Sequence, residues 1–257
     1  MTGDNSRVHL DRDYALSLGF HDNFAHGLLG GSWAAGLLSR ERLPGSMEVN
    51  FDLPVFVGDT LHLSATRGAG CEFSVRNQRA QVTSRGRLEF VDVAQLDGRA
   101  APPIFEPTDF QADAGKVYYA RDIIADGPRG RSSPHRFEAQ EVRAFCQFTG
   151  QGLQGGEWVP SMLVFCRSFA DWLKAFTQVA LPDSGSPGHL QDRWLQHRPV
   201  YIGDELTTHY RPGGLRLSNS RPGMGLLEIE LQTVNQHGEL VQHSTVLLMM
   251  AASEPRK

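Results

Sequence analysis

Near its start the chain carries a carboxylate and an imidazole whose spacing could serve proton transfer. Asp4 and His9 lie five residues apart, and His26-Gly27 follow at the predicted start of an apolar helix. A carboxylate and an imidazole that converge on one water molecule can remove and return a proton near neutral pH. The first N–H groups of a helix have no partner within it, so they can stabilise a developing oxyanion. These residue types therefore indicate acid–base catalysis.

The segment between the two candidate residues is predicted to be a loop. Five residues do not align two side chains on a straight helix, where three or four would. Asn5, Ser6 and Arg7 suit a loop. Taken in isolation, the pair has another interpretation, in which Asp4 caps a helix and His9 is a surface histidine.

Residues 2–11, followed by His26-Gly27, resemble the hydratase signature of the MaoC-like family of (R)-specific enoyl-thioester hydratases and dehydratases. That signature reads Gly-Asp, a spacer, Asn-Pro, an aliphatic residue, His, any residue, Asp, and then a His-Gly pair. This chain departs from it where Ser6 replaces Asn and Arg7 replaces Pro. Serine keeps hydrogen-bonding capacity, whereas Arg7 adds a charge that would favour an anionic substrate group.

The resemblance implies a role for each residue of the motif. Asp4 and His9 would hold one water against the double bond of an enoyl thioester, and water and proton would add to the same face. The Gly27 N–H would bind the thioester carbonyl, since a residue without a side chain allows close approach. Four further residues are expected to line the substrate or support the loop: Ser6, Arg7, Asp11 and His26.

The chain also repeats itself. The segment Pro54-Val-Phe-Val-Gly-Asp returns at position 199 as Pro-Val-Tyr-Ile-Gly-Asp, an offset of 145 residues. Thr2-Gly3-Asp4 returns as Thr149-Gly150-Gln151, an offset of 147. Two matches at nearly the same offset indicate a duplicated unit. Because Gln151 replaces Asp4 and Pro160-Ser161 replaces His26-Gly27, the second unit cannot perform the same proton chemistry. It is expected to leave room for a long acyl chain or to serve as a scaffold.

Each unit is predicted to hold one strong helix followed by antiparallel strands. Residues 28–38 are apolar or small all round, which indicates burial on every side, and the glycines there would allow close backbone approach. The second helix, residues 162–176, carries charges that would meet solvent or a partner. Residues 227–231 alternate and residues 240–251 form a long apolar run, as in strands. The first unit lacks an opening strand, and residues 116–124 are expected to cover the exposed edge.

The predicted fold class is α+β. The resemblance implies a double hot-dog, in which a central helix is wrapped by an antiparallel sheet twice. We expect a first unit over residues 1–98 that carries the motif, a Pro- and Gly-rich connection over residues 99–133, and a degenerate second unit over residues 134–257.

Composition narrows the class of partner. The 257 residues carry a net charge of −4, so no basic surface argues for nucleic acid or for an anionic membrane. No apolar run approaches a membrane span, and no signal peptide is visible, so we expect a cytoplasmic protein. The three cysteines have no metal or disulfide spacing and are expected to be buried thiols. No metal and no cofactor is expected.

The predicted function is an enoyl-thioester hydratase or 3-hydroxyacyl-thioester dehydratase that acts on coenzyme A or acyl-carrier-protein thioesters. Two alternatives stay open. One is a catalytically silent acyl-thioester-binding or assembly subunit, and the other is a different thioester reaction in the same pocket, such as hydrolysis by a thioesterase or ring closure by a cyclase. Pairing of two chains into a homodimer also stays open.

Overall fold

The computed structural model describes residues 6–40, 42–68, 70–96, 99–108, 110–152, 157–182 and 187–254. The described helices are α1 (Arg7–Leu10), α2 (Arg12–Ser17), α3 (Gly27–Leu38), α4 (Val93–Leu96), α5 (Ala120–Asp126), α6 (Ala139–Thr149) and α7 (Ser161–Phe176). The strands are β1 (Leu43–Phe51), β2 (His62–Arg67), β3 (Cys71–Arg76), β4 (Val82–Val91), β5 (Gly130–Arg131), β6 (His135–Arg136), β7 (Gly188–Gln196), β8 (Glu205–Leu217), β9 (Met224–Asn235) and β10 (Leu240–Ala251).

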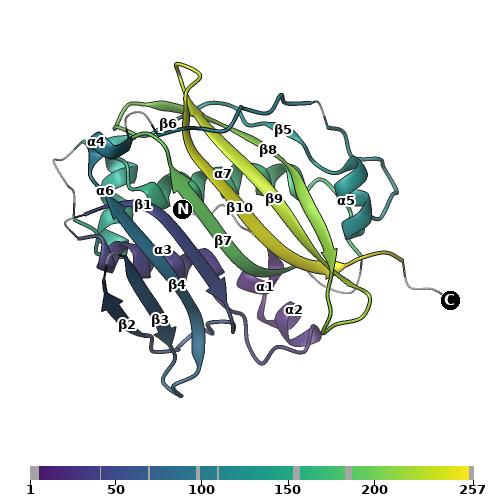
Figure 1. The fold of residues 1–257 in the computed structure, drawn as a ribbon. Coiled ribbons are helices and arrows are strands. Elements are labelled where there is room, and N and C mark those ends of the chain that lie inside the picture. The colour runs from purple at the N-terminus through teal and green to yellow at the C-terminus, as the bar shows by residue number, and fades with distance from the viewer. Residues whose placement is uncertain are drawn as a thin grey trace.

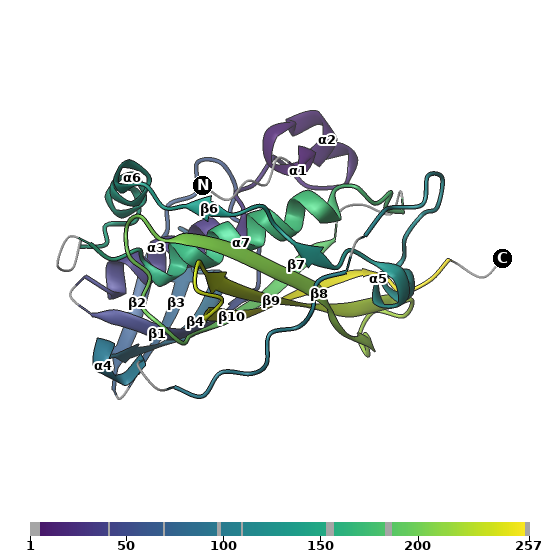
Figure 2. The ribbon, with the colours of Figure 1, turned by 90° about the horizontal axis from the view of Figure 1, so that it is seen from above.

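The strands form one antiparallel sheet in the order β2-β3-β4-β1-β7-β10-β9-β8-β5, and β6 also pairs with β8. The first four strands and the next four are arranged alike on either side of the contact between β1 and β7. That contact is antiparallel and runs from Ser46 opposite Leu195 to Asn50 opposite Gln191. Helices α3 and α7 lie on the same face of the sheet, one on each half (Figures 1 and 2). The repeat seen in the sequence is therefore a repeat of helix and four-stranded sheet.

The repeated Gly-Asp segments form the same turn in both units. The carboxylate of Asp59 accepts a hydrogen bond from the N–H three residues earlier at 2.9 Å, and Asp204 does so at 2.8 Å. Gly58 and Gly203 precede these aspartates with φ of +88° and +96°, a conformation that favours glycine. These residues therefore set the entry into the following strand. A glutamine side chain also donates to each aspartate: Gln78 to Asp59, and Gln236 to Asp204.

Helix α3 lies close to its neighbours because small residues face them. An added Cβ at Gly36 would lie 2.5 Å from the Cβ and the carbonyl oxygen of Thr149 in α6. Ser32 Oγ lies 3.4 Å from Cys166 Sγ in α7, and both residues are buried. The prediction that glycines in this helix allow close backbone approach is confirmed at Gly36.

The predicted core pattern is confirmed in the second unit. Leu227, Ile229 and Leu231 point into the core with no exposed surface, and β10 spans residues 240–251 as predicted. The three cysteines are buried and form no disulfide. On α7, Lys174 meets solvent as expected, whereas Asp171 is buried and pairs with Arg167 at 2.8 Å. No helix among the described residues is both long and apolar enough to span a membrane.

The expectation for residues 116–124 is wrong in its location. Tyr118, Ala120 and Ile123 of this segment are buried, but against the second unit. The Tyr118 N–H donates to the Ala180 carbonyl, and the Arg121 N–H donates to the Ala252 carbonyl. Helix α5 contacts β8 and β9 (Figure 1). The connection reaches it across the outer face of the sheet, where the Phe105 N–H donates to Gln232 (Figure 2). Short strands at Gly130 and His135 on β8 follow, so the connection serves the edge of the second unit.

Candidate functional site

The described part of the first motif segment, residues 6–11, covers α1 and the start of α2, two short helices that sit beside the first turn of α3 (Figure 2). Asp4, the predicted acidic partner, lies outside the described residues. His9 lies on α1, so the prediction of a loop is wrong for Arg7, with which this single helical turn begins. Val8 and Ala15 anchor the two helices, with 4% and 0% of their surface exposed. Burial of these two side chains fixes the face on which His9 stands.

The orientation and tautomer of His9 are set by the residues before α3. His9 Nδ1 lies 2.8 Å from the carbonyl oxygen of Phe24. A carbonyl oxygen only accepts, so Nδ1 carries the hydrogen and the neutral ring has its lone pair on Nε2. Asn23 Nδ2 donates to the His9 carbonyl at 2.9 Å and holds the backbone of the same residue. The ring is therefore prepared to accept a proton at Nε2.

The His26-Gly27 pair forms the start of α3 next to His9. His26 is the N-cap residue, and Gly27 is the first residue of the helix. The rings of His9 and His26 lie 4.1 Å apart between centroids. An added Cβ at Gly27 would lie 3.1 Å from the ring of Phe51, which leaves little room for a side chain. The structure thus places an imidazole beside the positive end of a buried helix, where backbone N–H groups favour negative charge.

Three other predicted site residues have partners among the described residues. Asp11 caps α2 by accepting from the Tyr14 N–H at 3.0 Å, and it pairs with Arg7 at 2.6 Å. The Tyr14 N–H and the Arg7 guanidinium hold the pKa of Asp11 below its ordinary value. Arg7 also lies over the Tyr14 ring at 4.2 Å and is exposed. Ser6 precedes α1, and its carbonyl accepts from the His9 N–H.

The equivalent helix start in the second unit is filled by packing. Ser161, the first residue of α7, is 1% exposed, and its hydroxyl donates to the Pro44 carbonyl at 3.0 Å. Gln242 donates to the Ser161 carbonyl at 2.8 Å. The hydroxyl and the carbonyl of Ser161 are therefore both paired within the protein, in agreement with the loss of the motif there.

Sequence reasoning missed the residues that hold His9 and Gly27 in place. Asn23 and Phe24 act on His9 through its backbone and ring, and Phe51 covers Gly27 from β1. The first two lie directly before Ala25-His26, so their proximity to the motif was a usable signal. Phe51 carried no such signal, because its position depends on how β1 packs against α3. Among the described residues, no group of His, Cys, Asp and Glu side chains could hold a metal ion.

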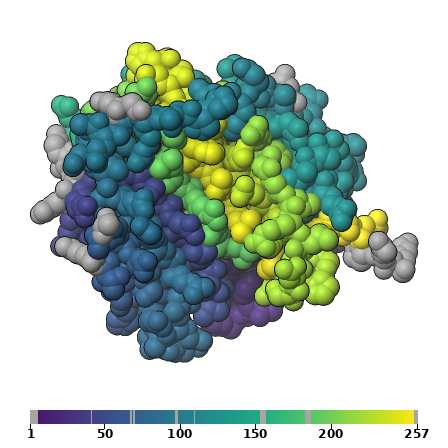
Figure 3. Space-filling model, in the orientation of Figure 1, coloured from purple at the N-terminus to yellow at the C-terminus, as the bar shows by residue number. Residues whose placement is uncertain are grey.

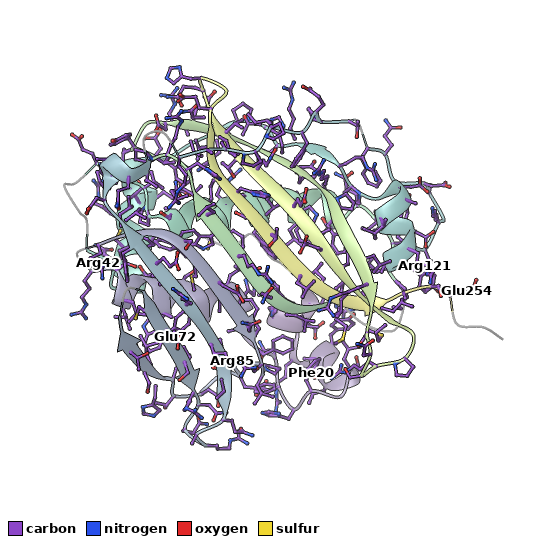
Figure 4. All side chains as sticks on the ribbon, viewed as in Figure 1. Phe20, Arg42, Glu72, Arg85, Arg121 and Glu254 are labelled. Carbon is purple, nitrogen blue, oxygen red and sulfur yellow. The ribbon has the colours of Figure 1, made fainter. Side chains whose placement is uncertain are left out.

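A groove of about 740 Å³ lies on the outer face of the sheet, away from His9 and Gly27. Charged side chains from β1, β3, β4 and β7 line it, and many are paired with one another, as Arg87 is with Glu89 and Arg193 with Glu48. Figure 3 shows this face, where the two units meet, and Figure 4 shows Glu72 and Arg85 on it. None of the predicted site residues lines this groove, so the candidate site stays at the start of α3.

Residues 1–87 match the family described as MaoC like domain. No sequence among curated proteins matches the chain. A MaoC domain protein from Chloroflexus aurantiacus J-10-fl superposes with a TM-score of 0.69 at 12% identity, and the match covers 98% of this chain and 89% of that one.

Two further solved structures are similar over nearly the whole chain. A conserved hypothetical protein from Mycobacterium tuberculosis with a double hotdog fold matches with a TM-score of 0.66 at 15% identity, over 97% of this chain and 89% of that one. A MaoC-like dehydratase matches with a TM-score of 0.60 at 12% identity, over 98% and 91%. The chain therefore has the double hotdog fold, and its first 87 residues are similar to the MaoC like domain.

Proposed function

We propose that the protein adds water to, or removes it from, the acyl group of a thioester, as an enoyl-thioester hydratase or 3-hydroxyacyl-thioester dehydratase. The observation that carries the proposal is the position of His9, whose Nδ1 donates to Phe24 while its ring lies beside the His26-Gly27 start of α3. An acid–base group and an oxyanion-binding helix end are the two parts that this reaction needs.

In the hydration direction, His9 Nε2 and the Asp4 carboxylate hold one water molecule beside the β-carbon of the enoyl group. As the water oxygen bonds to the β-carbon, the His9–Asp4 pair removes a proton from the water. Electron density moves through the α-carbon to the thioester oxygen, where the Gly27 N–H and the positive end of α3 stabilise it. The pair then delivers a proton to the α-carbon from the same face. Dehydration follows these steps in reverse.

The contacts of His9 contribute by fixing its ring before substrate binds. The Phe24 carbonyl selects the tautomer with a basic Nε2, and Asn23 holds the His9 backbone. A catalytic base that already has its reactive orientation adds no reorientation cost to the activation free energy. The wrong tautomer would present a hydrogen to the water instead of a lone pair, so this contact bears directly on the rate.

The test is a hydration assay with trans-2-enoyl thioesters of different chain length, carried by coenzyme A and by acyl carrier protein. His9→Gln and Asp4→Asn should each lower kcat/KM by about 10²- to 10⁴-fold, the range for loss of a general acid–base group. His21→Gln is the matched control, because this histidine lies in the same segment but contacts Phe56. It should keep the activity of the parent protein.

The same assay separates the proposal from its alternatives. Release of free thiol without hydration would identify a thioester hydrolase. Binding of enoyl thioesters with no hydration and no exchange of hydrogen at the α-carbon would identify a silent binding subunit. Full activity of both variants would remove Asp4 and His9 from the mechanism.

A further inference from the structure

A second imidazole–carboxylate pair lies next to Phe51, in the unit that lacks the motif. His189 Nε2 and Asp192 Oδ1 on β7 are 2.6 Å apart. Side chains three residues apart on a regular strand point to opposite faces. Here Leu190 is an extra residue, since Leu247 pairs with Gln191 and Leu248 with His189. This bulge turns His189 to the helix-facing side, where Asp192 also lies.

The pair is joined to the candidate site by Phe51. The Phe51 ring lies 4.8 Å from the His189 ring and is the ring that an added Cβ at Gly27 would meet at 3.1 Å. His189 also stacks on Phe169 of α7, with ring centroids 5.3 Å apart and an interplanar angle of 8°. The imidazole therefore contacts the same Phe51 ring that lies against Gly27.

The hydrogen bonds of the pair are incomplete. Asp192 is 1% exposed, and its Oδ2 atom has no hydrogen-bond partner among the described residues. The His189 side chain is 18% exposed, and no group of the described residues hydrogen-bonds to its Nδ1. Buried polar groups are normally paired, so a purely structural pair would be expected to satisfy the Oδ2 atom of Asp192.

The net charge of the His189–Asp192 pair determines whether Nδ1 of His189 is a hydrogen-bond donor or acceptor. A lone carboxylate in this setting would be costly, and burial raises the pKa of Asp192, although the nearby His189 opposes that rise. A pair with no net charge avoids this cost. The shared proton can lie on either partner, and in both cases Nδ1 of His189 keeps its hydrogen. The accessible end of the pair is therefore a hydrogen-bond donor.

We propose that His189, oriented by Asp192, is a substrate-binding residue that donates from Nδ1 to an oxygen atom on the acyl chain of a thioester held at Gly27. The acyl group would then be oxygenated beyond the reacting carbons, by a hydroxyl, a carbonyl or a carboxylate. The second unit thus supplies specificity to the site of the first. This inference rests on the proposed function for the placement of the thioester.

Saturated acyl-coenzyme A compounds test the inference without any turnover. Binding is measured by calorimetry for hexanoyl-coenzyme A, for analogues with a hydroxyl on the fourth, fifth or sixth carbon, and for the analogue that ends in a carboxylate. The parent protein should bind at least one oxygenated compound about tenfold more tightly than the plain one, which is the effect of one buried hydrogen bond. Comparison of the hydroxyl analogues with the carboxylate analogue shows which kind of oxygen atom, and at which carbon, His189 binds.

His189→Phe should abolish this preference and leave the affinity for hexanoyl-coenzyme A within about threefold. His189→Leu is the second variant in case the larger ring does not fold. His62→Phe is the matched control, because His62 is an exposed strand residue on β2, and it should keep the preference. A parent protein without preference, or a preference that survives in both His189 variants, would overturn the inference. Failure of hydration with a retained preference would instead overturn the proposed function alone.

Discussion

Two glycines on α3 should respond in opposite ways to the same substitution. Gly36→Ala and Gly30→Ala both add one methyl group inside one helix, and each should gain up to about 1 kcal/mol in helix propensity. At Gly30 the nearest atom would be Ser84 Oγ at 3.9 Å, which is ordinary contact. At Gly36 the new Cβ would lie 2.5 Å from Thr149, against 3.4 Å for the start of ordinary contact, so α3 and α6 must separate by about 0.9 Å.

Overpacking of this kind costs about 1–3 kcal/mol, because neither the Thr149 backbone nor the helix can yield freely. Propensity is common to both variants, so their difference in unfolding free energy isolates the packing cost. Urea denaturation should place Gly36→Ala about 1–3 kcal/mol below Gly30→Ala, and thermal melting should separate them by several degrees. Equal stability of the two variants would show that α3 and α6 are not in close contact as described.

Three further predictions concern buried and turn residues. Burial raises the pKa of Cys166 to about 12 from 9.0, so alkylation of this thiol at pH 8 should be about a thousandfold slower in the native than in the denatured protein, and equal rates would argue against its burial. Burial also raises the pKa of Asp192 above 3.8, so above about pH 4 the native state holds a proton that the unfolded state has lost. The free energy of unfolding should therefore fall as pH rises from about 4 through the folded-state pKa. Asp192→Asn should reduce this dependence on pH in urea titrations. Asp59→Ala and Asp204→Ala should each cost about 1 kcal/mol in urea denaturation, because they remove the same turn contacts, and markedly unequal losses would contradict the equivalence of the two turns.

Much of the architecture is local in origin and could be predicted. The helix of residues 28–38 and the strands around Leu227 and Leu240 follow from side-chain patterns typical of each kind of element. Burial of this helix on every side was predicted as well, but Trp33 and Leu37 stay partly exposed. The duplicated Pro-Val-x-x-Gly-Asp segment marks a turn that depends on its own aspartate and glycine, so it forms twice. These features need no knowledge of distant contacts.

The parts that could not be predicted depend on contacts between distant segments. Residues 116–124 are apolar enough to pack against either unit, and only the hydrogen bonds to Ala180 and Ala252 decide which. The inward position of His189 depends on a bulge that pairing with β10 creates, so strand alternation alone would place it outward. The contact of Phe51 with Gly27 likewise arises where β1 passes the start of α3.

The stereochemistry of hydration in D₂O tests the central claim most directly, namely that His9 and Asp4 activate water beside the oxyanion-binding start of α3. A trans-2-enoyl thioester is hydrated and the position and face of deuterium at the α-carbon are read by NMR. The account predicts an (R)-3-hydroxyacyl thioester with one deuterium on the same face as the new hydroxyl, formed at least about 10²-fold more slowly by His9→Gln. Addition to opposite faces, or the same product from the variant at the parent rate, would contradict it.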